Sequence, residues 1–160
     1  MTPPPLVYLD AAATSFPKPP AVIDAVAEAL RRSGSPGRSG HRLAIDAARE
    51  LFATRQAVAE LVGAHDPRQV VFTAGATASL NLALWGLLSE PGSHVVCSGL
   101  EHNSVARPLA ALQRARGIRV SRVVPRADGV LDPADFANAL RPETKLVVVN
   151  HVSNVCGAIA

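Results

Sequence analysis

Residues 73–77, Thr-Ala-Gly-Ala-Thr, combine small side chains with two hydroxyl groups, and an apolar run with helical spacing follows them. Small residues let the backbone approach a ligand closely, and the start of a helix offers unpaired N–H groups and the positive end of its dipole. Thr77 adds a hydroxyl donor. The segment is therefore predicted to bind an anion such as a phosphate, and a plain helix start with small packing residues is the alternative. The segment is not a Walker A loop, because no Gly-Lys-Ser/Thr follows it, and there is no GxGxxG motif for a dinucleotide.

A histidine follows in the next polar segment, residues 99–104, Gly-Leu-Glu-His-Asn-Ser. A lone histidine most often caps a helix. Near a phosphate loop, however, an imidazole can also stack on a flat ligand or move protons close to neutral pH. His102 is therefore a candidate for both roles, and Glu101 is a weaker candidate for orienting it, because neighbouring side chains in a loop usually diverge.

A third polar segment is found at residues 150–157, Asn-His-Val-Ser-Asn-Val-Cys-Gly. Asn150, Ser153 and Asn154 can hydrogen-bond a ligand without adding charge, or they can satisfy the backbone of their own turn. No metal site is predicted, because the histidines show no HxH or HExxH spacing.

These segments belong to an alternating series of strands and helices. The expected strands are 69–73, 94–98, 118–124 and 146–150, and the expected helices are 77–89, 104–116 and 133–140. Such alternation predicts an α/β fold with a mainly parallel sheet covered by helices on both faces. Ligands of these sheets bind at the carboxyl ends of the strands. The loops after Thr73, Ser98 and Asn150 are therefore where chemistry is expected.

The chain before residue 69 has a different pattern. Residues 1–20 hold six of the 13 prolines and are expected to form an extended arm. Proline at the first turn opens a helix that ends near Gly34, a glycine-rich loop spans 33–40, and a long amphipathic helix follows and ends near Gly63.

Composition excludes several classes of protein. Apolar residues make up 48% and charged residues 18%, which favours a folded domain. The net charge of +3 comes from scattered arginines, and aromatics are 4%, so nucleic-acid binding is not expected. No apolar run approaches the roughly 20 residues that a membrane span needs. No signal peptide pattern begins the chain. Cys97 and Cys156 lie in apolar segments without CxxC spacing, which predicts two buried, reduced thiols and a cytoplasmic protein.

Five segments, in order, resemble the pyridoxal-phosphate enzymes of the class V aminotransferase family, most closely the cysteine desulfurases and selenocysteine lyases. They are residues 8–19, 36–42, 72–78, 101–105 and 151–157. The resemblance covers essentially the whole chain. It implies the type I fold of pyridoxal-phosphate-dependent transferases. Residues 1–20 would be an amino-terminal arm, and residues 21–160 an incomplete cofactor-binding large domain.

The resemblance also implies site residues. Ala76 and Thr77 match the positions that hold the cofactor phosphate. His102 matches the histidine that stacks on the pyridine ring and takes part in proton transfer, which makes it the catalytic candidate. Asn154 matches the asparagine that hydrogen-bonds the cofactor's phenolic oxygen. Arg38 and His41 fall in a loop that borders the active-site mouth in this family, where a structural role is the favoured interpretation.

Other parts of the family machinery are missing from this sequence. The lysine that holds the cofactor, the aspartate for its pyridinium nitrogen, the arginine for the substrate carboxylate and the nucleophilic cysteine all lie downstream of Asn154 in the family pattern. Lys18 lies on the proline-rich arm and Lys145 opens a strand, so neither is a credible Schiff-base lysine. Cys156 is interpreted as a packing residue. The chain is therefore expected to be cut in mid-fold and inactive alone.

The function that follows is the amino-terminal part of a pyridoxal-phosphate-dependent cysteine desulfurase-like enzyme. Such an enzyme converts L-cysteine, or L-selenocysteine in the related lyases, to alanine, and a desulfurase passes the sulfur to an enzyme thiol as a persulfide. The resemblance further implies a homodimer for the complete protein, and a sulfur-acceptor protein is a possible partner. Two alternatives stay open: another enzyme of the family, such as an aminotransferase, epimerase or lyase, and a non-catalytic remnant or interaction module.

Overall fold

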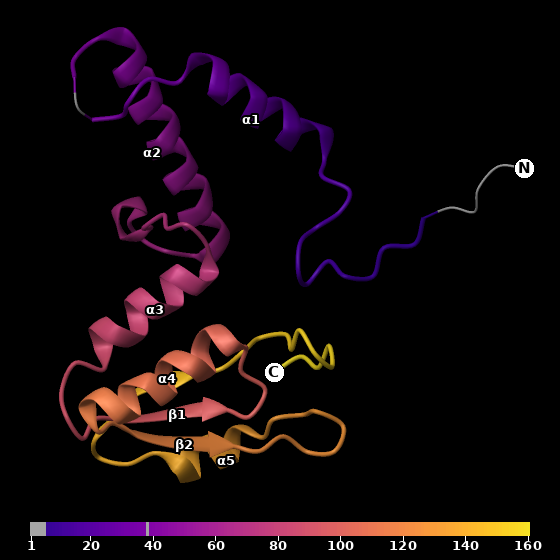
Figure 1. The fold of residues 1–160 in the computed structure, drawn as a ribbon, viewed down its shortest axis with the longest axis vertical. Coiled ribbons are helices and arrows are strands. Elements are labelled where there is room, and N and C mark those ends of the chain that lie inside the picture. Colours follow the sequence, from indigo (N-terminus) through magenta and orange to yellow (C-terminus); the bar gives the residue numbers. More distant parts are fainter. Residues whose placement is uncertain (1–5, 38) are drawn as a thin grey trace, which may run out of the picture. The chain divides into compact units, whose positions relative to one another are not determined.

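The computed structural model describes residues 6–37 and 39–160 (Figure 1). It divides into two compact units, residues 1–71 and 72–160, which are considered separately below. In the described ranges, no helix is both long enough and apolar enough to cross a membrane.

The first unit is helical. Helix α1 spans Pro20–Arg32, helix α2 spans Arg42–Val62, and the short 3-10 helix η1 spans Pro67–Gln69. Gly63 ends α2 in the left-handed conformation at φ 68°, as expected for a glycine that follows a helix. Among the described residues of this unit, the buried apolar side chains are those of Ala44 and Ala59. The apolar face of α1 is consequently exposed.

The second unit contains a three-stranded parallel sheet. Its strands are β1 (His94–Ser98), β2 (Arg119–Val123) and β3 (Thr144–Val148), in the order β2-β1-β3. The helices are α3 (Ala76–Leu87), α4 (Asn103–Arg116) and α5 (Pro133–Ala139). Figure 1 shows α4 and α5 on opposite sides of the sheet. The predicted α/β class with a parallel sheet and flanking helices is confirmed.

Strand β1 is buried along its whole length because it is the central strand and both of its faces are covered. Val95 and Cys97 face a core formed with α3 and α4, and Val96 faces a smaller core on the α5 side. The partners in the larger core are Leu84 of α3, Leu88 directly after it, and Val105, Leu109 and Leu112 of α4. Alternate residues of one apolar run thus fill two cores, which explains why its sequence shows no polar alternation.

His94 joins the three strands at their amino ends. Its side chain is fully buried, with Nδ1 2.8 Å from Thr144 Oγ1 of β3 and Nε2 2.9 Å from Ser121 Oγ of β2. Both ring nitrogens therefore have partners, as buried polar groups require. Lys145, near the same end of β3, pairs with Glu90 at 3.6 Å.

The predicted strand at 69–73 is wrong. Residues 67–69 form η1, and residues 70–73 lack a ladder partner in the described chain. A strand depends on a neighbour as well as on its own apolar residues, and Val71 is 63% exposed. The strand predicted at 146–150 begins and ends two residues earlier. Asn150 therefore lies beyond β3.

Candidate functional site

Helix α3 begins without a side-chain cap. Gly75 precedes it at φ 152° and ψ 173°, a region that is essentially restricted to glycine. The hydroxyl of Thr73 braces this turn: it lies 2.9 Å from the carbonyl oxygen of Gly75, 3.3 Å from its backbone nitrogen and 2.7 Å from Ser79 Oγ. Among the described residues, no side chain accepts a hydrogen bond from the first turn of α3, so its backbone N–H groups are available to a ligand.

Helix α4 begins differently, behind His102. The backbone N–H of Ser104 donates to His102 Nδ1 at 3.0 Å, and Ser104 Oγ lies 2.8 Å from the same nitrogen. Because Nδ1 accepts, the neutral imidazole carries its proton on Nε2. The expected helix cap is therefore confirmed, and it fixes the ring while leaving Nε2 outside the cap.

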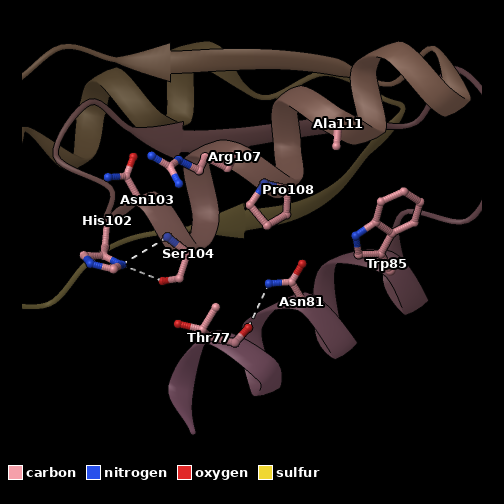
Figure 2. A pocket seen from close by; sticks show the side chains of 9 residues that line it. All are labelled: Thr77, Asn81, Trp85, His102, Asn103, Ser104, Arg107, Pro108 and Ala111. Atoms are coloured by element: carbon pink, nitrogen blue, oxygen red, sulfur yellow. Dashed lines mark hydrogen bonds between the residues drawn. The ribbon is translucent and has the colours of Figure 1, made fainter.

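The two helices line an open cavity of about 500 Å³. Its lining consists of Thr77, Asn81 and Trp85 from α3, and of His102, Asn103, Ser104, Arg107, Pro108 and Ala111 from α4. Figure 2 shows Thr77 and His102 near the start of their helices and Trp85 at the far end of the cavity. Arg116 secures that far end, with its guanidinium 4.9 Å from the Trp85 ring centroid and 2.8 Å from the Trp85 carbonyl oxygen.

Of the lining residues, Thr77 and His102 were predicted as site residues and the others were not. Asn81 and Trp85 follow Thr77 at intervals of four residues, so they share its face of the helix. That spacing is present in the sequence and could have identified them. Arg107 is the only arginine or lysine lining the cavity in the described part of the chain. Its position in the helix sequence did not indicate that its side chain lines the cavity.

Asn154 lies on a separate turn. Val152 and Ile159 form an antiparallel bridge, and Ser153 Oγ accepts the backbone N–H groups of Val155 and Cys156 at 3.3 and 3.4 Å. Asn154 is exposed and is not among the described residues that line the cavity. The structure thus brings Thr77 and His102 to one cavity, next to the helix start at Ala76, and places Asn154 outside it.

The two cysteines differ in exposure. Cys97 is buried in the sheet, and burial raises the pKa of its thiol. Cys156 is exposed, and the hydrogen bond with the Ser153 hydroxyl, followed by one with the Ala158 backbone, holds the pKa of its thiol below the ordinary value. The prediction of a buried thiol and a packing role is wrong for Cys156, because the turn that carries it lies beyond the sheet.

The remaining candidate residues that the structure describes make contacts outside the cavity. Arg38 lies outside the described residues. His41 caps α2, where its Nδ1 accepts the backbone N–H of Ala44 at 3.3 Å. Lys18 makes local contacts within its arm, including one of 2.9 Å to Ser15 Oγ. Glu101 does not orient His102, because its carboxylate contacts Ser98 and Asn150 instead.

Fold and cavity together define an α/β protein in which an uncapped helix start and a histidine face one ligand-sized space. The family model for aminotransferase class-V matches residues 7–160. The chain therefore belongs to the class-V aminotransferase family.

Relatives of this chain carry the name cysteine desulfurase. The chain is 35% identical over 159 residues to cysteine desulfurase IscS of Proteus mirabilis, a match that covers 96% of this chain and 39% of that protein. The apo structure of a cysteine desulfurase from Thermococcus onnurineus matches with a TM-score of 0.85 at 33% identity, covering 96% of this chain and 38% of the other. The Escherichia coli cysteine desulfurase CsdA, in an S-sulfonic acid form, matches with a TM-score of 0.77 at 28% identity, covering 95% and 39%. This chain thus spans about two fifths of their length.

Proposed function

We propose that this chain is the amino-terminal part of a pyridoxal-phosphate-dependent cysteine desulfurase-like enzyme and contributes the cofactor's phosphate site. The observation that carries the proposal is the uncapped start of α3 beside His102 in a single cavity. The similarity to proteins named cysteine desulfurase supports the same reaction class.

The residues at the start of α3 fit a phosphate group. Free N–H groups and the positive end of the helix dipole favour a bound anion. A side chain at Gly75 would occupy open space next to these N–H groups, and glycine leaves that space to a ligand. The Thr77 hydroxyl and the Arg107 guanidinium, which both line the cavity, add a donor and a positive charge.

His102 is the proposed catalytic residue. Its Nδ1 is held by Ser104, so the ring has a fixed orientation and Nε2 is the atom that gives or takes a proton. The same flat ring would stack on the pyridine ring of the cofactor, which supplies an electron sink when bound. Asn154 would donate a hydrogen bond to the phenolic oxygen.

Several finer assignments belong to this proposal. L-cysteine is the proposed substrate, with L-selenocysteine as the related one, and the complete protein is proposed to be a homodimer that passes sulfur to an acceptor protein. A cytoplasmic location and the division into an arm and an incomplete large domain also stay predictions. Because neither Lys18 nor Lys145 fits the role of a Schiff-base lysine, we expect this chain alone to bind the cofactor without a covalent bond.

The test is a binding titration of this chain with pyridoxal phosphate, monitored by the fluorescence of Trp85, its only tryptophan. We expect saturable quenching, because Trp85 lines the cavity and the coloured cofactor absorbs its emission. Pyridoxal without phosphate is the matched ligand control and should bind far more weakly. Absence of binding would contradict the proposal and favour a non-catalytic module. Release of alanine from L-cysteine by this chain would contradict the expected inactivity.

A further inference from the structure

We propose that Glu101 is a positioning residue that fixes the turn bearing Asn154 relative to His102. The inference rests on the proposed function, since it concerns two residues assigned to the cofactor. It starts from the carboxylate of Glu101, which links the segment after β1 to the segment after β3.

The first step is the way β1 leaves the sheet. After Ser98, the backbone N–H of Gly99 donates to the carbonyl of Val123 at 2.8 Å, on the β2 side. The approach is close, because a Cβ on Gly99 would lie 3.2 Å from that carbonyl oxygen and 3.1 Å from Pro125 Cδ. The pairing of β1 with β3 meanwhile ends at Cys97 and Val148. The chain after β3 therefore no longer has a strand neighbour.

Glu101 supplies the partner that the strand no longer provides. Its Oε1 accepts the backbone N–H of Asn150 at 2.8 Å, two residues beyond β3. The same oxygen accepts the Ser98 hydroxyl at 2.5 Å, and Ser98 is only 2% exposed. The Asn150 amide group also donates to the Leu100 carbonyl at 3.4 Å. A charged acceptor makes stronger hydrogen bonds than a neutral one, so the carboxylate is the main link.

This link fixes the position of the turn that bears Asn154 relative to the segment that carries His102. Glu101 directly precedes His102, and Asn150 stands four residues before Asn154. The turn beyond Asn150 is closed on itself, because Ser153 donates to Ala158 at 2.9 Å and Ala160 donates to His151 at 2.9 Å. A closed turn moves as one piece, so its attachment at Asn150 determines where Asn154 lies. The cap between His102 and Ser104 does not involve Glu101.

The experiment compares Glu101→Ala with Glu101→Gln in the full 160-residue chain. The first reading is amide hydrogen exchange at Asn150 without cofactor. We expect Glu101→Ala to speed exchange at this amide about tenfold or more, because its acceptor is lost. Glu101→Gln should stay within about threefold of wild type, because its amide oxygen can accept the same bonds.

The second reading separates the two halves of the ligand site. Glu101→Ala should weaken pyridoxal phosphate about tenfold, the effect of losing roughly one charge-assisted hydrogen bond. It should leave the affinity for inorganic phosphate unchanged, because the start of α3 does not involve Glu101. Glu101→Gln should restore cofactor binding.

Each outcome has a defined meaning. Unchanged exchange at Asn150 in Glu101→Ala, equal loss of phosphate and cofactor, or a glutamine variant that behaves like alanine would each overturn the inference. If wild type fails to bind pyridoxal phosphate, the proposed function fails, and the exchange rates alone then decide the role of Glu101.

Discussion

The two helices that line the cavity, α3 and α4, begin in opposite ways. Helix α4 starts behind His102, whose ring accepts one of the first backbone N–H groups. Helix α3 starts behind Gly75 and has no side-chain cap. At the start of α4, a backbone N–H thus has a hydrogen-bond partner within the protein. At the start of α3, the N–H groups are left for an external partner such as a ligand. The difference locates the phosphate site at α3 and assigns the ring-stacking and proton-transfer roles to α4.

Other helices of the chain support this distinction. His41 caps α2, and Asp132 caps α5 by accepting the backbone N–H of Ala134 at 2.9 Å. Helix α1 lacks a side-chain cap but has proline in its first turn, which removes one N–H that would need a partner. Among the described α-helices, α1 and α3 therefore both lack a side-chain cap, and of these two only α3 keeps the N–H of its first residue.

The largest expected effect comes from closing the α3 start. Gly75→Val should weaken phosphate and pyridoxal phosphate binding by at least about 30-fold, because a β-branched residue cannot adopt this backbone conformation without strain. The measurement is the affinity from fluorescence titration. Gly86→Ala is the matched control inside α3: a Cβ there meets nothing within 4 Å, so binding should be retained. Equal affinities for Gly75→Val and wild type would contradict the assignment.

A smaller effect is expected from the Thr77 hydroxyl. Thr77→Val keeps the shape of the side chain but removes the donor, and should weaken phosphate binding about tenfold, as expected for a hydrogen bond to a charged group. Thr77→Ser keeps the hydroxyl and serves as the control. If the valine and serine variants bind alike, Thr77 is only a packing residue.

The α4 start can be tested by separating its cap from its ring. His102→Ala should lower the free energy of unfolding by about 1 kcal/mol, the usual value of an N-cap, while His102→Asn should retain most of it. Urea unfolding measures this difference. Both variants should lose cofactor binding that depends on the ring and keep the affinity for inorganic phosphate. Full cofactor binding by His102→Asn would argue against stacking.

At the opposite end of the sheet, the contribution of His94 to the stability of the fold should depend on pH, while ligand binding should not depend on this residue. Burial, with a further contribution from Arg141 and Arg119 against an opposing one from Glu143, lowers the pKa of His94. As the pH falls, His94 therefore becomes protonated in the unfolded chain before it does so in the folded protein. The contribution of His94 to stability is complete above the unfolded value of about 6.5 and declines as pH falls towards the folded value. Urea midpoints should fall between pH 8 and 5.5 more steeply for wild type than for His94→Gln. Parallel curves would contradict this.

Local signals in the sequence predicted most of the second unit. The segment at 94–98, with its apolar centre Val-Val-Cys, was predicted as strand β1 with its observed bounds, and Gly117 ended α4 at φ 65°, because such signals act within a few residues. The strand at 69–73 failed because a strand also needs a distant partner. The division at residue 71 and the exposed Cys156 likewise depend on tertiary arrangement.

The site residues also divide into those that local signals predict and those that depend on tertiary contacts. Thr77 and His102 were predicted because the start of a helix and its capping residue are local features. Asn81 and Trp85 could have been predicted from helical spacing. The contact between Glu101 and Asn150 joins residues far apart in the chain, and adjacent residue types gave no sign of it.

The most direct test of the central claim is a titration with inorganic phosphate, monitored by the backbone amide signals in ¹⁵N NMR spectra. Phosphate has no aromatic ring, so it reports anion binding without ring-current effects from the cofactor. The account predicts saturable shifts for the amides of Ala76, Thr77 and Ala78 at the start of α3, while Ser104, whose N–H is already bound to His102, stays in place. Shifts centred on Ser104, or no saturable shift at α3, would contradict it.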